Sequence, residues 1–280
     1  MKPFLVIVPT PELSTEPLVS ALALAQSTGR ALLVLHHTAN EAQTLSLARC
    51  HSLAQQCSDE SGQVVQFYSQ CGSPLYEAID SVLRLTPCDL IIKSQDGEPM
   101  DWQVLKRSPL PVWMLTPKVR VKKGTVVAAL DLGHRSPRVE RLNVHVLKQA
   151  KCLAQAQGAE LHVLYVPVLA GFWKDLDLLN ARWRERRAME NKTLPLAWLA
   201  GEGVTEERIH VKAGNPGLVI RDMSCALGAN TLVLGCVPRR GLMAAIKGEG
   251  GLPQQLMAHL SCHLLLVPEK SCVDTPAVNA

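Results

Sequence analysis

The stretch LVLGCVPRRGLMAAIKGEGG, residues 232–251, combines an apolar segment ending at Leu234 with a basic loop rich in glycine. Loops of this composition bind phosphate, because glycines let backbone N–H groups approach an anion and a following helix adds positive potential. Arg239, Arg240 and Lys247 lie in the loop and are well placed to hold an anion. The stretch is therefore a candidate site for a phosphate-bearing ligand.

Two residues of the same loop oppose that chemistry. Pro238 has no N–H to donate and fixes the backbone angle φ near −65°. Glu249 brings a negative charge close to the expected phosphate oxygens, and like charges in contact repel by about 1 kcal/mol even in water. The sequence thus leaves open a loop that binds an anion and a degraded loop that only packs.

Motifs for catalysis are absent from the sequence. It contains no Ser-His-Asp set, paired-carboxylate motif, HExxH or Walker A sequence, so no nucleophile or base is nominated. A weak ATPase would need a metal-holding carboxylate near the loop, and Glu249 is the only candidate. His259, Cys262 and His263 have the residue types of metal ligands, but we interpret the histidines as surface residues at a helix end and expect no metal site.

The composition is that of an ordinary globular protein. With 280 residues, 47% hydrophobic and 19% charged, the chain is long enough for two domains of ~140 residues. A net charge of +4 and only three Phe and three Tyr argue against a nucleic-acid binder. No apolar run approaches the 18 residues of a membrane span, and the nine scattered cysteines form no CxxC motif, so we expect reduced thiols in the cytoplasm.

The two halves of the chain repeat one ordered set of apolar segments. Matching pairs are GRALLVLHH (29–37) with GAELHVLYV (158–166), CDLIIKS (88–94) with ANTLVLG (229–235), PVWMLTP (111–117) with HLLLVP (263–268), and FLVIVP (4–9) with VVAALD (126–131). Strands are predicted near 4–8, 31–36, 64–68, 89–93, 111–115, 125–130, 160–166, 208–211, 231–234 and 263–267. Apolar strands alternating with helices predict an α/β fold of two doubly wound, five-stranded parallel sheets. The second half has ten more residues between its fourth and fifth strands, and these form the loop described above.

Helix signals separate the strands. In the second half, Ser136 is a predicted N-cap, Pro137 stands at the first helical position and Gly158 follows the last turn. Leu142, Val146, Ala150 and Leu153 recur on one face between these ends. The first half has an equivalent helix ending at Gly29.

Together these segments resemble the tandem universal stress proteins of the bacterial E type. The resemblance rests on VVAALDLG with GAELHVLYV, on VKAGNPGLVIRDMSCALGANTLVLG, and on DWQVLKRSPLPVWML in the first half. It implies two domains of the adenine nucleotide alpha hydrolase-like fold, at 1–116 and 124–268, joined by a linker and followed by a disordered tail at 269–280. In such a chain the last strands of the two domains, 111–115 and 263–267, would pair as an internal pseudo-dimer, with a homodimer also open.

The family's nucleotide signature, G-x2-G-x9-G-[ST], is half present. Gly235 and Gly248 match, whereas Pro238 and Glu249 replace the second glycine and the hydroxyl residue. The resemblance also implies that Asp131 contacts the nucleoside and that Val166 lies on the adenine side. Read without the family, Asp131 is equally well a cap of the helix that follows it.

The first half lacks these features, since Pro9 replaces the aspartate and the glycine loop is missing, so we expect no nucleotide there. The resemblance implies a cytoplasmic stress-response protein whose second domain binds ATP or a related ligand. The alternative is an interaction protein that binds a partner or an acyl-bearing ligand and no nucleotide. Residues 172–187 form either the wall of an apolar cleft for such a ligand or an ordinary core stripe with a solvated face.

Overall fold

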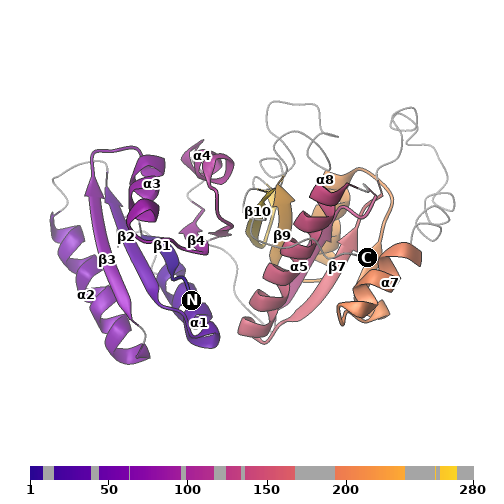
Figure 1. Cartoon of the computed structure of the whole chain (residues 1–280), viewed down its shortest axis with the longest axis horizontal. Helices are drawn as coiled ribbons and strands as arrows, with labels where there is room; N and C mark the ends of the chain where they lie inside the picture. The colour runs from indigo at the N-terminus through magenta and orange to yellow at the C-terminus, as the bar shows by residue number, and fades with distance from the viewer. Residues whose placement is uncertain are drawn as a thin grey trace. The chain divides into compact units, whose positions relative to one another are not determined.

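The structure, a computed structural model, divides the chain into two compact units, Met1–Val119 and Arg120–Ala280 (Figure 1). It describes residues 1–8, 16–38, 44–62, 64–95, 99–116, 124–133, 136–167, 193–236, 256 and 259–269. Each unit is treated by itself below.

The first unit is a parallel sheet with helices between its strands. Its elements are β1 (Phe4–Val8), α1 (Glu16–Thr28), β2 (Leu32–Thr38), α2 (Thr44–Ser61), β3 (Val65–Cys71), α3 (Leu75–Leu85), β4 (Leu90–Ser94), α4 (Pro99–Arg107) and β5 (Val112–Leu115). The strand order is β3-β2-β1-β4-β5, and each neighbouring pair is parallel. Leu5, Val6 and Ile7 in the central strand are fully buried, so the core of this unit surrounds β1.

The second unit repeats this order. Its elements are β6 (Thr125–Leu130), α5 (Pro137–Gln157), β7 (Glu160–Tyr165), α7 (Thr193–Gly201), the short 3-10 helix η2 (Glu206–Arg208), β8 (Ile209–Val211), α8 (Pro216–Ala226), β9 (Ala229–Cys236) and β10 (His263–Pro268). The strands run in the order β10-β9-β6-β7-β8 and pair in parallel. Helix α5 crosses the sheet and contacts β6, β7, β9 and β10 (Figure 1).

All ten strands predicted from the sequence are present, and their ends lie within about three residues of the expected ones. β3 differs from the central strands, because its residues are exposed or only half-buried. β3 is the last strand in the order of its unit, so one of its edges has no neighbour within that unit. Its polar residues, such as Gln66 and Gln70, fit that position.

The ends of helix α5 are fixed by the residues predicted to do so. Ser136 precedes the helix and its hydroxyl accepts a hydrogen bond from the Val139 N–H at 3.3 Å. At the other end Gly158 adopts φ 58°, a left-handed conformation that glycine reaches without steric cost. These caps set where the chain enters and leaves the helix, and therefore where the strands on either side end.

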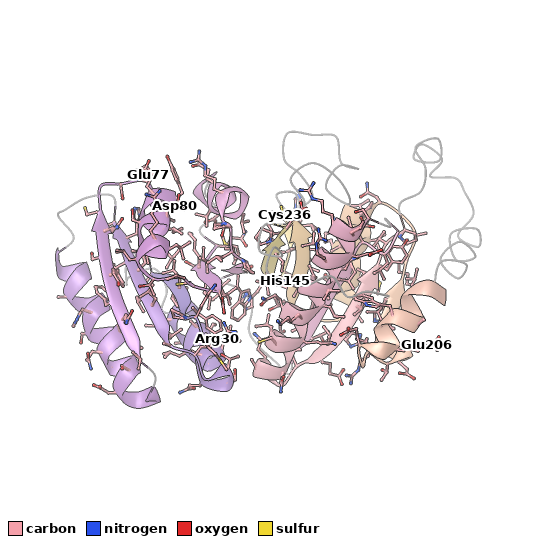
Figure 2. All side chains as sticks on the ribbon, in the orientation of Figure 1. Arg30, Glu77, Asp80, His145, Glu206 and Cys236 are labelled. Carbon is pink, nitrogen blue, oxygen red and sulfur yellow. The ribbon has the colours of Figure 1, made fainter. Side chains whose placement is uncertain are left out.

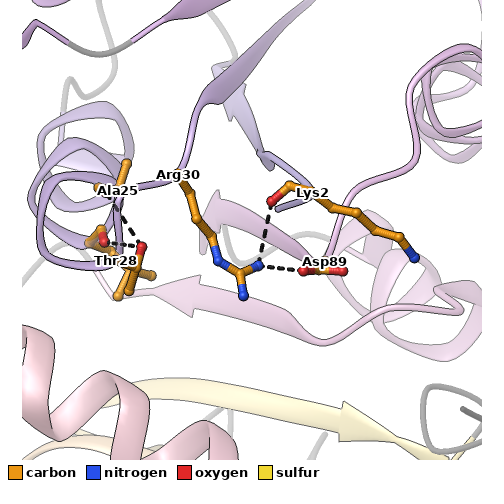
Figure 3. A network of polar contacts seen from close by, with 6 residues as sticks. Lys2, Ala25, Thr28, Arg30 and Asp89 are labelled. Atoms are coloured by element: carbon orange, nitrogen blue, oxygen red, sulfur yellow. Dashed lines mark hydrogen bonds and ion pairs between the residues drawn. The ribbon is translucent and has the colours of Figure 1, made fainter.

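Arg30 connects the amino ends of several strands of the first sheet (Figure 3). Its guanidinium pairs with Asp89, donates to the Lys2 carbonyl at 3.4 Å and stacks over the Phe4 ring at 5.0 Å. Thr28, at the end of α1, donates its hydroxyl back to the Ala25 carbonyl (Figure 3). The contacts of Arg30 join the starts of β1, β2 and β4 within the first unit.

Among the residues that the structure describes, no helix combines the length and apolar character needed to cross a bilayer. The cysteines whose side chains are described are all free thiols: Cys71, Cys88, Cys152, Cys225, Cys236 and Cys262.

Candidate functional site

The strand order places three predicted site residues at one edge of the second sheet. β6 lies between β7 and β9. After β6 the chain builds the sheet outwards through β7 and β8, and it then returns to the other side of β6 to form β9. The boundary between β6 and β9 is therefore a topological switch point. Asp131 follows β6, Val166 follows β7, and Gly235 lies near the end of β9, where Cys236 is also seen (Figure 2). Ligands of open α/β sheets bind in the crevice outside the carboxyl ends of strands at such a point.

Asp131 is held in place through its main chain. The side-chain amide of Asn143, on α5, accepts a hydrogen bond from the Asp131 N–H at 3.1 Å and donates one to the Asp131 carbonyl at 2.7 Å. Asn143 is buried, so it satisfies two backbone groups just beyond the last residue of β6. The backbone of Asp131 is thereby fixed, while its side chain remains half-exposed at the sheet edge.

The carboxylate of Asp131 starts a tight turn. Its Oδ1 atom accepts from the Gly133 N–H at 3.3 Å. A Cβ atom at Gly133 would lie 2.8 Å from the hydroxyl of Tyr165 on β7, so a side chain there would have to displace that hydroxyl. Burial raises the pKa of Tyr165, and the nearby Asp131 carboxylate raises it further, so the phenol stays protonated at neutral pH. The edge therefore presents a carboxylate and a neutral hydroxyl side by side.

Gly235 has a packing role that the sequence did not indicate. A Cβ atom at this position would lie 2.8 Å from Cδ2 and 2.9 Å from Cγ of Leu142, on α5. Val146, one turn later, would be 3.3 Å away. The absence of a side chain at Gly235 is thus already required by the close approach of α5 to β9, with or without a ligand.

Leu234 and Val166 contribute apolar surface rather than polar contacts. Both are buried, with 4% and 2% of their surface exposed. Leu234 lies on β9 and Val166 directly follows β7, and these two strands flank β6.

The remaining predicted site residues lie outside the described part of the chain: Arg239, Arg240, Lys247, Gly248 and Glu249, together with Pro238. Their roles stay predictions. The structure therefore brings together Asp131, Val166, Leu234 and Gly235, and it adds Asn143 and Tyr165, which sequence reasoning missed. Asn143 carried a weak signal, since it is a polar residue within the apolar face of its helix.

One ion pair at this edge was also missed. Arg138, in the first turn of α5, pairs through Nε with Glu269, which directly follows β10. Arg138 is largely exposed, whereas the Glu269 side chain is only 11% exposed. No pattern in the sequence relates these residues, which are separated by 131 positions.

The interpretation of the histidines near β10 as surface residues is wrong for His263. His263 is the first residue of β10 and is 2% exposed, and burial lowers its pKa to about 4. The neighbouring Cys262 is equally buried, and burial is the main cause that raises its pKa to about 12. Within the described ranges, no group of three or more His, Cys, Asp or Glu residues is arranged to hold a metal ion.

Comparisons with known proteins identify the family and the fold of the chain. The model of the Universal stress protein family matches residues 128–268, which lie within the second unit and include Asp131 and Gly235. A protein of unknown function from Pseudomonas aeruginosa PAO1 has the same fold, with a TM-score of 0.78 at 23% identity, covering 97% of this chain and 94% of that one.

Several curated relatives carry the name universal stress protein E. The protein from Photorhabdus laumondii subsp. laumondii is 28% identical over 197 residues, covering 67% of this chain and 61% of the relative. The protein from Escherichia coli K12 is 31% identical over 179 residues, covering 60% of this chain and 54% of the relative. The match thus spans little more than half the length of these relatives. Because the family match covers half of the chain, the chain belongs to the universal stress protein family.

Proposed function

We propose that this stress-response protein is cytoplasmic and that its second unit binds an adenine nucleotide or another phosphate-bearing ligand beyond β6 and β9. The observation that carries the proposal is Asp131, a half-exposed carboxylate at the topological switch point whose main chain is clamped by Asn143. A carboxylate accepts several hydrogen bonds at once, so the turn bond from Gly133 is compatible with further bonds from ribose hydroxyls.

The rest of such a ligand would meet groups of complementary character. The neutral hydroxyl of Tyr165 is a donor beside the carboxylate, and the buried, apolar Val166 directly follows the same strand, β7. The phosphates would then extend towards the loop that contains Arg239, Arg240 and Lys247. Cationic side chains in a glycine-rich loop are suited to phosphate oxygens.

We further propose that the first unit is a second, diverged universal-stress-like domain without a nucleotide loop. The support is the shared strand order of the two units and the equivalent register of their central strands. Ile7 of β1 lies opposite Lys93 of β4, as Ala129 of β6 lies opposite Leu234 of β9. The sequence repeat aligns these same residues with each other.

The alternative is an interaction protein that binds a partner or an acyl-bearing ligand and no nucleotide. Gly235 favours it, because the close packing of Leu142 accounts for that glycine without a ligand. Pro238 and Glu249 favour it as well, since they remove a donor and add a negative charge. Neither function requires catalysis, and an ATPase would depend on Glu249 alone as the metal-holding carboxylate.

Thermal shift measurements with ATP and Mg²⁺ separate the two functions, because a ligand that binds only the native state raises the melting temperature. ATP at about 100 times Kd stabilises by about 2.7 kcal/mol. Nucleotide binding predicts a shift that is reduced in Lys247→Ala and in Asp131→Ala. No shift with wild-type protein, together with a co-purified acyl compound found by mass spectrometry, would instead establish the alternative.

A further inference from the structure

The first unit contains an ion pair buried more deeply than the other ion pairs among the described residues. Lys93, on β4, donates from Nζ to Oδ1 of Asp101, on α4, at 2.7 Å. The side chains are 3% and 1% exposed. Nζ also donates to the Ser94 carbonyl at 2.9 Å. Removing two charges from water is costly, and a lysine in such a place requires an anionic partner.

The pair lies at the switch point of its own sheet. β1 lies between β2 and β4. The chain passes from β1 to β2 and β3 on one side and later returns to form β4 on the other, as it does around β6 in the second unit. Lys93 occupies the register position that Leu234 has in the second unit, and Ser94 the position of Gly235. A buried cation therefore stands where the second unit has an apolar residue just before its glycine-rich loop.

Helix α4, which follows β4 after a short connection, supplies the anion. Only four residues separate Ser94 from Pro99, the first residue of α4, and Asp101 lies in the first turn of that helix. The helix N-terminus stabilises a carboxylate in its first turn. At its other end α4 is secured by Arg107, whose guanidinium lies 4.1 Å from the centre of the Tyr76 ring on α3. Helix α4 thus holds a carboxylate against Lys93 at the edge where the fold ordinarily receives ligands.

We propose that Lys93 is the centre of an anion-binding site in the first unit, for a carboxylate or phosphoryl group, and that Asp101 fills it. The carboxylate of Asp101 takes the place of the ligand, so the first unit carries its own anion. The proposal concerns a different unit from the nucleotide site proposed above and does not depend on it.

Chemical rescue tests the proposal in the full-length protein. Asp101→Ala leaves a buried lysine without this carboxylate, and the melting temperature should fall by about 10 °C. Sodium formate should then raise the melting temperature by several degrees relative to sodium chloride of equal ionic strength. This effect should saturate as the formate concentration rises. Acetate and inorganic phosphate, tested in parallel, show whether the space admits larger anions. Wild type should respond to formate no more than to chloride.

Two variants serve as controls. Asp80→Ala removes an exposed carboxylate from α3 of the same unit and should show no formate effect (Figure 2). Lys93→Met with Asp101→Leu replaces the pair by apolar residues, should fold, and should likewise ignore formate. Carbon-13 formate should show line broadening with Asp101→Ala and none with the double variant.

Equal responses to formate and chloride in Asp101→Ala would show a purely structural ion pair and overturn the proposal. If Asp101→Ala is insoluble in chloride, recovery of folded protein in formate supports the site. Failure to fold in both salts, while the double variant folds, overturns it.

Discussion

The side chain of Asn143 forms two hydrogen bonds with the main chain of Asp131, one to the N–H and one to the carbonyl. The amide thus continues, from helix α5, the kind of pairing that a neighbouring strand would provide. This contact fixes the main chain of Asp131 at the proposed ligand site.

Replacing Asn143 by leucine should lower the free energy of unfolding by about 1–3 kcal/mol, because two buried main-chain groups lose their partner. The effect is measured by urea denaturation. Gln155→Leu, at an exposed position of the same helix, is the matched control and should change stability little. Equal stabilities for the two variants would show that water replaces the amide without cost.

Gly235→Ala should destabilise the protein by about 1–3 kcal/mol, since the new Cβ atom overlaps with Leu142. Shortening Leu142 to alanine should relieve the overlap, so the double variant should be more stable than the sum of the single effects predicts. The double-mutant cycle is read from denaturation curves without ligand. Additive effects, with ATP affinity lost only in Gly235→Ala, would assign the glycine to the ligand instead.

Helix α5 and its contact with Gly235 show which features the sequence could predict and which it could not. Apolar runs, Ser136, Pro137 and Gly158 predicted strands and helix ends, because they depend on local composition and backbone conformation. The packing of Leu142 on Gly235 depends on the distance between α5 and β9, which no local pattern reveals.

The buried ion pair of the first unit was not predicted from the sequence either. Lys93 and Asp101 are eight residues apart in the sequence, and they pair because helix α4 begins at Pro99. This helix was not predicted from the sequence, since the segment after β4 contains glycine and proline. The choice between Asp131 as helix cap and as ligand contact is narrowed by Ser136, which performs the capping of α5. Asp131 instead accepts from Gly133 in its own turn.

Burial of His263 predicts a pH dependence of stability. Folded His263 remains neutral down to about pH 4, whereas an unfolded histidine takes up a proton near pH 6.5. The unfolded state therefore binds more protons between these values, and the free energy of unfolding should fall by up to about 3 kcal/mol as pH drops from 6.5 to 4.

His263→Leu should flatten this slope, measured by denaturation at several pH values. The slope will not vanish, because burial also lowers the pKa of His36, with His37 adding to the effect. His259→Gln removes an exposed histidine from the same segment and should leave the slope as in wild type. An unchanged slope in His263→Leu would show that His263 becomes protonated in the folded state.

The two departures from the family signature yield the sharpest test of the nucleotide site. Pro238→Gly with Glu249→Ser restores two donors and removes one negative charge, and hydrogen bonds to charged groups contribute about 1.5–3 kcal/mol each. A net gain of about 2–4 kcal/mol corresponds to roughly 30- to 1,000-fold in the Kd for ATP. The same changes combined with Asp131→Ala should gain less, because the nucleoside end loses its carboxylate while the phosphate end improves. Calorimetry on wild type, the double variant, Asp131→Ala and the triple variant gives all four constants. Micromolar binding by wild type with no gain in the double variant would contradict the expectation, and it would assign phosphate binding to Arg239, Arg240 and Lys247 instead of the backbone.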